Sequence, residues 1–447
     1  MIIRYTPELI GSIFTDQAKF QSWLDVELAF VKIRCERGDY PEDIYPRMVV
    51  QAKFDVNEII ELDKKIEHDM LAFIENVRSY MDEDLRKYFH KGLTSYDIEV
   101  PAQSIVLQRA EEIILTDLNS LVMAVRMQAS RHMWTYRMGM SHGKDGKPST
   151  FGWLLNSTAL TGFELGQKNL QECFKQTRLA KCSGAMGNYM TITPELEEAV
   201  LSELGLIPRA STQINMRDVL ANLLSQIATI GGVMEKLAID LRLMATSRFE
   251  EVCEPRRKEQ KGSSAMPHKK NPIILERVTG MSSLLRCYDQ AMKENIKTWL
   301  ERDIAQSSVE RIAMVDSLVL FDYMLQKMTW IMNNLVVDRE NMIRNIDASY
   351  GIWASEDVKL MLCDMDFDTD EVYIFVQQCA FTALEDRVSF KTVLQTTVFP
   401  PANKQFIDVV DLKKLDECFD YVSKLVNLKK MYERSNLDFE IALEPNC

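Results

Sequence analysis

Apolar residues recur at alternating intervals of three and four over long stretches of this chain. Between residues 218 and 247 they keep this spacing from Leu220 to Met244. The spacing places apolar side chains along one face of an α-helix and predicts a single long amphipathic helix. Similar patterns run through residues 105–133, 151–178 and 309–335, whereas the strict alternation typical of half-buried strands is scarce. Several long helices predict an all-α helical bundle.

Polar breaks separate these helices at residues 139–148, 184–194 and 254–272. A chain of 447 residues is too long for one compact unit, so several domains are expected. We place soft boundaries near Leu93 and Asn345. The predicted organisation is an N-terminal helical domain (1–93), a central long-helix bundle (94–345) and a smaller C-terminal helical domain (346–447).

The formal net charge of −13 argues against a general nucleic-acid or anionic-membrane surface, since such partners are held by clustered Lys and Arg. No uncharged apolar run is long enough to cross a bilayer, and residues 1–7 lack the features of a signal peptide. The nine Cys residues are scattered, with no spacing typical of a metal site. We expect reduced thiols, a cytoplasmic protein and no bound metal.

The third break contains the most informative string, Gly-Ser-Ser-Ala-Met-Pro-His-Lys-Lys-Asn-Pro, at residues 262–272. Its glycine and prolines exclude a regular helix and predict a mobile polar loop. A serine hydroxyl is a poor base and a poor nucleophile at neutral pH, so a serine acting on an anionic substrate needs nearby cations. Lys269 and Lys270 supply them. Ser263 and Ser264 are chemically equivalent candidates.

This string resembles the signature loop of the fumarase/aspartase superfamily, whose members eliminate fumarate from succinyl-substituted substrates. The preceding Gln-Lys and the following Glu276-Arg277 are more similar to the adenylosuccinate lyase family than to its relatives. The resemblance implies that Ser263 removes the proton from carbon. It also implies that Lys269 and Asn271 stabilise the resulting dianion, that Glu276 is catalytic and that Arg277 binds substrate.

His142, in the first break, lies in a Gly-Met-Ser-His-Gly string that resembles a second signature of this family. The resemblance implies that His142 is the general acid. The chemistry agrees, because imidazole titrates near neutral pH and can protonate a leaving nitrogen. The competing interpretation is a histidine that caps a helix near a Gly-rich turn. His132 lies in a helical pattern, and we interpret it as a packing or surface residue.

Thr94 and Ser95 lie in a His-Lys-Gly-Leu-Thr-Ser-Tyr-Asp string that resembles the region binding a substrate carboxylate. Hydroxyls and free N–H groups at a helix start form an anion site, although Thr-Ser before Asp is by itself only a helix N-cap. By the same resemblance, Gln213 contacts substrate. The resemblance also implies that His68 and Asp69 belong to the site and that His68 holds phosphate or orients His142.

Arg4 and Tyr5 resemble the family's nucleotide-contacting pair, and Arg302, Ser307 and Arg311 resemble its phosphate cluster. Arg guanidinium groups and hydroxyls suit a phosphate monoester. The alternative for Arg302 and Arg311 is ion pairing on the helix surface with their sequence neighbours Glu301 and Glu310.

The resemblance implies a cofactor-free lyase that converts adenylosuccinate into AMP and fumarate, and that also cleaves the succinyl-aminoimidazole carboxamide ribotide of purine synthesis. It also implies a homotetramer with active sites shared between subunits. Three departures concern substrate identity: Glu67 stands where an arginine is common, and Met140 and Asp145 alter the string around His142. They favour a first alternative, a superfamily lyase acting on a related succinyl or aspartyl adduct. A second alternative is a catalytically silent structural homologue.

Overall fold

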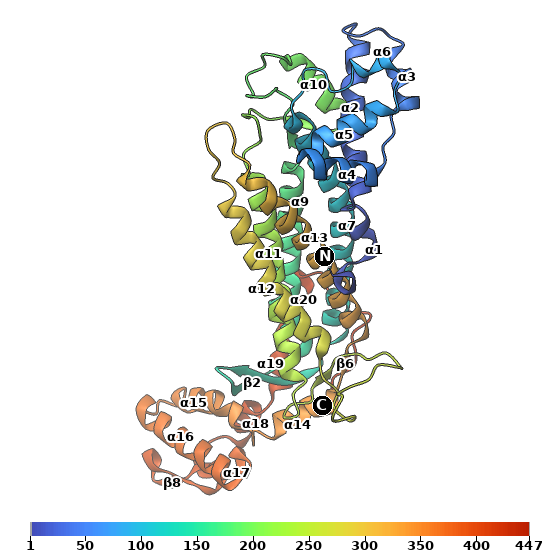
Figure 1. The fold of residues 1–447 in the computed structure, drawn as a ribbon. Helices are drawn as coiled ribbons and strands as arrows, with labels where there is room; N and C mark the ends of the chain where they lie inside the picture. Colours follow the sequence, from blue (N-terminus) through green and yellow to red (C-terminus); the bar gives the residue numbers. More distant parts are fainter. Residues whose placement is uncertain (1, 447) are drawn as a thin grey trace. The chain divides into compact units, whose positions relative to one another are not determined.

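Figure 1 shows the computed structural model, which describes residues 2–446. Helices account for 64% of the structure and the strands are few and short, which confirms the all-α class. The chain divides into two compact units. Unit 1 comprises the described parts of Met1–Ser120, Phe163–Met234 and Val278–Lys327, and unit 2 comprises those of Leu121–Gly162, Glu235–Arg277 and Met328–Cys447. The three-domain division at residues 93 and 345 stays a prediction.

Five long helices have the apolar spacing seen in the sequence: α7 (Ser95–Arg131), α9 (Thr161–Gln176), α11 (Asp218–Met244), α12 (Ile273–Glu294) and α13 (Ala305–Asn334). Unit 1 also contains η1 (Ile3–Tyr5), α1 (Glu8–Ser12), α2 (Asp16–Glu36), α3 (Ile44–Gln51), α4 (Val56–Ile66), α5 (Asp69–Ser79), α6 (Glu83–Arg86), α10 (Pro194–Glu203) and the parallel pair β3 (Leu179–Ala180) and β4 (Ile207–Pro208). No helix within residues 2–446 has the length and apolar character needed to span a membrane.

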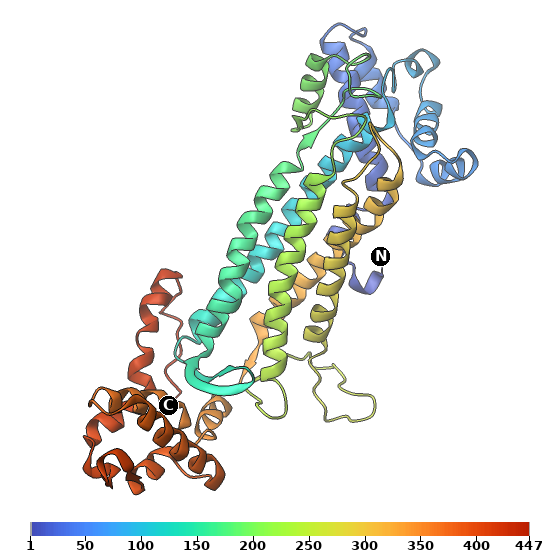
Figure 2. The same ribbon diagram turned by 90° about the vertical axis from the view of Figure 1, so that its left-hand side faces the viewer.

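Within unit 1, segments of the long helices run side by side, as Figure 2 shows. Small residues allow this close approach. A Cβ added to Gly166 of α9 would lie 2.7 Å from Ile230 of α11, and one added to Gly231 would lie 2.8 Å from Leu285 of α12. The Ser282 hydroxyl donates to the Gly231 carbonyl at 3.0 Å. The bundle therefore has tight, specific helix contacts.

The N-terminal helices of unit 1 share an aromatic core. Phe20 and Trp23 of α2 pack against Phe73 of α5, with ring centroids 6.0 and 5.5 Å apart. All three side chains are buried, and burial of each contributes about 1.5–3 kcal/mol. The Thr15 hydroxyl accepts the Ala18 N–H and so fixes the start of α2. This core positions α2 and α5, which carry Lys19 and Asp69.

Unit 2 contains a hairpin, β1 (Tyr136–Ser141) and β2 (Lys144–Thr150), in which Tyr136 pairs with Thr150 and Ser141 with Lys144. At its tip, His142 and Gly143 both have positive φ, at 52° and 72°. Positive φ at both central positions is the requirement of a type I′ turn, which matches the twist of the strands. The first polar break is therefore a strand pair, which the hydrophobic pattern did not predict.

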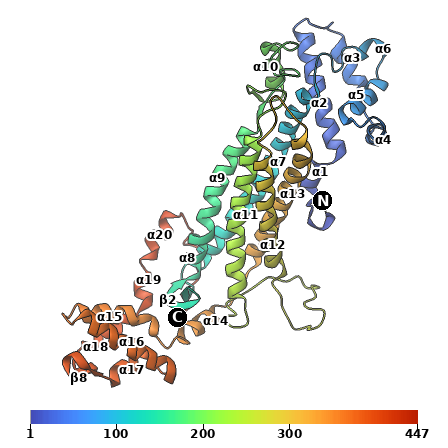
Figure 3. The ribbon, with the colours of Figure 1, turned by 60° about the vertical axis from the view of Figure 1, so that its left-hand side comes forward.

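Besides parts of the long helices, unit 2, seen also in Figure 3, contains a series of further helices and short strands. They are α8 (Phe151–Leu155), the π-helical turn η2 (Asn156–Leu160), β5 (Val252–Cys253) paired with β6 (Val336–Val337), α14 (Arg339–Asp347), η3 (Ile352–Ala354), α15 (Ser355–Cys363), α16 (Thr369–Asp386), α17 (Phe390–Thr396), β7 (Val398–Phe399) paired with β8 (Lys404–Gln405), η4 (Pro400–Ala402), η5 (Phe406–Asp408), α18 (Leu412–Cys418), α19 (Tyr421–Leu425) and α20 (Leu428–Arg434). Phe375, Phe399 and Phe406 form an aromatic core among the later elements.

Candidate active site

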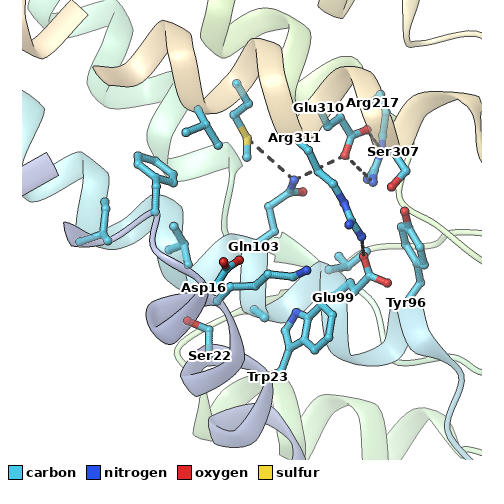
Figure 4. A pocket seen from close by; sticks show the side chains of 18 residues that line it. Asp16, Ser22, Trp23, Tyr96, Glu99, Gln103, Arg217, Ser307, Glu310 and Arg311 are labelled. Atoms are coloured by element: carbon cyan, nitrogen blue, oxygen red, sulfur yellow. Dashed lines mark hydrogen bonds and ion pairs between the residues drawn. The ribbon is translucent and has the colours of Figure 1, made fainter. Parts of the chain in front are cut away.

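A cavity of about 330 Å³ in unit 1 contains two of the three residues predicted to bind phosphate, Ser307 and Arg311 (Figure 4). It is lined by residues of α2, α7 and α13, together with Arg217, which precedes α11. The three helices bring together segments far apart in sequence. The cavity therefore depends on the tertiary packing of unit 1.

Arg311 is held in this cavity by a carboxylate. Its guanidinium donates to Asp69 Oδ2 at 2.8 Å, and Lys19 Nζ donates to the same oxygen at 3.0 Å. Burial favours the neutral form of Asp69, but the two cations outweigh it and hold the pKa of this carboxyl below its ordinary value. The structure thus brings together the predicted residues Asp69 and Arg311 and adds Lys19, which the sequence did not single out.

Glu99 of α7 is a second carboxyl beside Arg311, with Oε2 at 3.8 Å from the guanidinium. Burial, followed by the negative charge of Asp69, raises the pKa of Glu99 to about 7. Glu99 was not among the residues predicted from the sequence. The one feature of the sequence that could have pointed to it is its position, one helical turn after the Thr94-Ser95 string.

The alternative of a local ion pair between Arg311 and Glu310 does not describe this structure. Glu310 accepts two hydrogen bonds from Arg217, at 2.7 and 3.1 Å, and both side chains are buried. Burial raises the pKa of Glu310, and Arg217 opposes that rise. The ion pairs of Arg311 are therefore formed with Asp69 and Glu99.

Arg302 lies flat on a tyrosine ring. Its guanidinium carbon is 3.8 Å from the centroid of Tyr96, a cation–π contact, and it donates to Gln213 at 3.2 Å. Gln306 donates to the Tyr96 hydroxyl at 2.8 Å and fixes the ring. The structure therefore joins two predicted residues, Arg302 and Gln213, and again shows tertiary partners in place of the alternative pairing with Glu301.

Thr94 and Ser95 lie at the start of α7, as predicted. The Thr94 N–H donates to Asp97 Oδ2 at 2.9 Å, so the N-cap interpretation describes the local structure. The other oxygen of Asp97 accepts from Lys181 Nζ at 2.6 Å and from the Gly184 N–H at 3.1 Å. Asp97 therefore ties the helix start to the loop after β3.

A glycine holds that loop close to the segment that carries Gln213. Gly187 has φ of +70°, and a Cβ there would lie 2.1 Å from the Ser211 carbonyl oxygen. Only glycine fits such a contact. Residues 183–187 thus lie against the segment 211–213, which contains the predicted site residue Gln213.

His68 and Arg4–Tyr5 belong to unit 1 but have other surroundings. His68 Nδ1 accepts the Leu71 N–H at 3.3 Å, so this exposed histidine caps α5. Tyr5 packs edge-on against Tyr323 of α13, with centroids 5.4 Å apart. Position 323 lies roughly 18 Å along the helix from Arg311, at 1.5 Å per residue. The N-terminal pair and the Arg311 cluster are therefore separated within one chain.

The signature loop lies in unit 2. Ser263 Oγ accepts hydrogen bonds from the N–H groups of Ala265 and Met266 at 3.3 and 3.2 Å. The hydroxyl proton of Ser263 takes no part in these two bonds. Ser264 is exposed and makes no such contact. Gly262 lies against the Lys269 carbonyl, 2.5 Å from an added Cβ, so the two ends of the loop meet.

Beside this loop, a second cavity of about 1150 Å³ is lined by Lys269, Asn271 and Glu276. Buried Glu254, which the sequence did not single out, accepts the N–H groups of Ile274 and Leu275 and fixes the start of α12. Burial raises the pKa of this carboxyl.

Arg277, predicted to bind substrate, also lies in unit 2, where it follows Glu276 in α12 and is half-buried. His142 is exposed at the hairpin tip of the same unit and caps no helix. Within residues 2–446, no hydrogen bond or ion pair joins His142 to Ser263, Lys269 or Asn271. The roles assigned to these residues stay predictions.

The chain is similar to known enzymes over nearly its whole length. Residues 8–285 match the family described as lyase. An adenylosuccinate lyase of Synechocystis sp. is 37% identical over 439 residues, and one of Bacillus subtilis is 38% identical over 442; each comparison covers 98% of this chain and 100% of the relative.

Two solved structures share the fold. A fumarate lyase from Mesorhizobium sp. BNC1 has a TM-score of 0.86 at 20% identity, covering 96% of this chain and 98% of that one. A 3-carboxy-cis,cis-muconate lactonizing enzyme from Pseudomonas putida has a TM-score of 0.86 at 21% identity, covering 97% and 98%. At these identities the likeness concerns the fold alone.

Proposed function

This chain belongs to the adenylosuccinate lyase family, and we propose from that membership that it converts adenylosuccinate into AMP and fumarate. It is a lyase that cleaves a C–N bond. We extend the proposal to the succinyl-aminoimidazole carboxamide ribotide, which presents the same succinyl-amino group on a ribotide. The single observation that carries the proposal is the 37–38% identity to two adenylosuccinate lyases over 98% of the chain.

The reaction requires a base, an acid and a site for negative charge. In the proposed mechanism Ser263 takes the proton from the carbon beside a carboxylate of the succinyl group. The electron pair left on that carbon forms the double bond of fumarate as the C–N bond breaks, and His142 gives a proton to the departing nitrogen. Lys269 and Asn271 stabilise the dianionic intermediate, since both line one cavity and present donors.

Glu276 and Arg277 follow directly on the loop, at the start of α12. We propose that Glu276 assists the catalytic groups of that loop and that Arg277 contacts the substrate. Glu276 lines the cavity with Lys269 and Asn271, which supports its part of this proposal.

Phosphate binding is assigned to Arg302, Ser307 and Arg311. Arg311 and Ser307 line the cavity of unit 1, and charge-assisted hydrogen bonds from Arg to phosphate are strong. Arg302, next to Gln213 and Tyr96, supplies a second guanidinium. Thr94 and Ser95, at the start of α7, are proposed to bind a succinyl carboxylate, and His68 and Asp69 to complete the site.

We further propose a cytoplasmic homotetramer whose active sites draw residues from neighbouring subunits. The separation along α13 between Tyr5 and Arg311 supports sharing, because one chain does not bring the two predicted nucleotide contacts together. A closed symmetric assembly is the usual form of soluble oligomers. The cysteines described in the structure are all free, in keeping with a reducing compartment.

The deciding experiment is an assay of the purified protein with adenylosuccinate, following loss of the substituted purine spectrum and appearance of fumarate. Stoichiometric release of AMP and fumarate is expected. A matched assay with a succinyl or aspartyl adduct that lacks the purine nucleotide tests the alternative favoured by Glu67, Met140 and Asp145. Turnover of that adduct alone would overturn the assignment of adenylosuccinate, and turnover of neither substrate would contradict a working lyase.

A further inference from the structure

Glu99 is a half-buried carboxyl group that lines the unit 1 cavity and lacks a close cationic partner (Figure 4). Asp69 is held by Lys19 and Arg311 at 3.0 and 2.8 Å. Among residues 2–446, the one ion pair of Glu99 is that of 3.8 Å to Arg311, whose guanidinium already donates to Asp69. Its side chain is 19% exposed, so water screens its charge only partly.

The charges around Glu99 come from three helices and from the segment that precedes α13. Lys19 belongs to α2, Asp69 to α5 and Arg311 to α13, while Arg302 lies just before α13. The remaining charged or titratable residues lining the cavity are Asp16, Tyr96, Arg217 and Glu310. Of these, Arg217 and Glu310 neutralise each other through two hydrogen bonds. The charges closest to Glu99 are therefore those of Asp69, Lys19 and Arg311.

Binding of an anion would change the net charge of this cluster. Lys19 and Arg311 contribute two positive charges, and Asp69 with ionised Glu99 contributes two negative charges, so the empty cluster is neutral. A phosphate monoester dianion at Arg311 would bring the total to −2 in a partly buried site, where Asp69 and Glu99 are about one-fifth exposed and Arg311 is half exposed. Uptake of one proton by Glu99 would reduce that to −1, and nearby like charges favour the neutral form of a carboxyl.

We propose that Glu99 takes up one proton from solvent when a phosphate monoester dianion binds at Arg311, so that nucleotide binding in this cavity is proton-coupled. The inference rests on the proposed function in placing the phosphate at Arg311. No other bond forms or breaks: a solvent proton joins one Glu99 oxygen on binding and leaves on release. Glu99 is thus a specificity-determining residue that adjusts the charge of the site to that of its ligand.

The ionisation of Glu99 suits this role. Burial, and after it the charge of Asp69, raises the pKa of the free carboxyl to about 7, while Arg311, Lys19 and Arg302 lower it. At pH 8 most of the empty sites therefore hold an ionised Glu99 that is ready to accept a proton. A phosphate monoester has its second pKa near 6, so AMP is already a dianion at that pH and contributes no proton change of its own.

The test is calorimetric titration of the full-length protein with AMP at pH 8, in several buffers that differ in ionisation enthalpy. The dependence of the observed heat on the buffer gives the number of protons taken up. Wild type should take up close to one proton per site, and its affinity for AMP should weaken by up to about tenfold per pH unit between pH 7.5 and 9.

Glu99→Gln imitates the protonated carboxyl and should bind AMP with no proton uptake and no such pH dependence. Glu112→Gln, at an exposed position on the same helix, is the matched control and should behave as wild type. Circular dichroism checks that each variant is folded. If Glu99→Gln does not fold, the wild-type proton count alone decides.

The outcomes separate the two proposals. AMP binding with no proton uptake by wild type, or uptake that persists in Glu99→Gln, overturns the role of Glu99 while adenylosuccinate cleavage stands. If the protein cleaves adenylosuccinate but shows no measurable AMP binding, only the proposal of proton-coupled binding in this cavity is overturned. Absence of both turnover and AMP binding overturns the proposed function as well.

Discussion

Lys181 and Asp97 form a salt bridge of 2.6 Å in which neither side chain is exposed to solvent. Lys181 also donates to the Gly184 carbonyl at 3.0 Å, and Asp97 accepts the N–H groups of Thr94 and Gly184. The pair thus connects the start of α7 to the loop at residues 183–187. Because Thr94 is a candidate ligand of the succinyl carboxylate, this buried pair positions a part of the proposed site.

Replacing Lys181 by Met should lower the free energy of unfolding by about 3–5 kcal/mol, because Asp97 would keep a buried charge without its partner. Urea denaturation measures the change. Lys175→Met is the control, since Lys175 forms an exposed pair with Glu172, and such pairs contribute about 0–1 kcal/mol. Equal stability of the two variants would show that the buried pair is not needed for the fold.

The long helices were predictable from the sequence because their apolar residues keep helical spacing. The prediction for residues 309–335 corresponds to α13, Ala305–Asn334, and that for 218–247 to α11, Asp218–Met244. Helix α7 begins at Ser95, before the regular spacing starts at residue 105. Its first turns are buried on more than one face, with Ile98 and Val100 in the hydrophobic core and Asp97 buried as well, so they lack the one-sided apolar spacing of an amphipathic helix.

The site could be predicted only in part. Motif strings identified Arg311 and Asp69, but no sequence signal pairs them, because they are 242 residues apart. The same holds for Glu99, whose environment is set by charges from three other elements. The hairpin around His142 was missed because its short polar strands lack the alternation of a half-buried sheet.

Ser263→Ala should abolish turnover of adenylosuccinate while leaving nucleotide binding within a few-fold of wild type, since the proposed phosphate contacts are untouched. Ser264→Ala is the matched control and should retain most of the activity, because only Ser263 Oγ is held by loop N–H groups. Steady-state kinetics and AMP titration measure both. Normal turnover of Ser263→Ala together with loss in Ser264→Ala would reassign the base to Ser264.

Removing the charge of Arg311 should weaken binding of AMP more than binding of succinate. A charge-assisted hydrogen bond contributes about 1.5–3 kcal/mol, so Arg311→Met should lose roughly ten- to a hundredfold in affinity for AMP. Arg302→Met should show the same selectivity. Arg47→Met, at an exposed ion pair of unit 1, is the control. Equal losses for AMP and succinate would mean that these arginines support the fold rather than bind phosphate.

His132 should make the protein sensitive to acid. It is buried, bonded to Thr135 at 2.9 Å, and burial with the charges of Arg131 and Arg339 lowers its pKa to about 4. An unfolded chain, with a His pKa near 6.5, binds more protons between pH 6.5 and 4, so stability falls as the pH drops through this window.

The loss due to His132 is at most about 3 kcal/mol. His132→Gln should reduce the difference in denaturation midpoint between pH 7.5 and pH 5, whereas exposed His268→Gln should leave it unchanged. An identical pH dependence in wild type and His132→Gln would assign the acid sensitivity to other groups.

The proposed sharing of sites makes a prediction about mixed subunits. Ser263→Ala and His142→Gln should each be inactive or nearly so. If the serine and the histidine of one site come from different chains, unfolding and refolding the two variants together gives sites that combine both intact residues. With random mixing, each of the two residues is intact in half of the chains, so about a quarter of the sites combine both. Activity should therefore return to roughly that fraction of wild type, while each variant refolded alone stays inactive.

Light scattering verifies assembly, and mass spectrometry of differently tagged chains verifies mixing. Failure to regain activity despite proven mixing, or a monomeric mass in solution, would contradict the shared site.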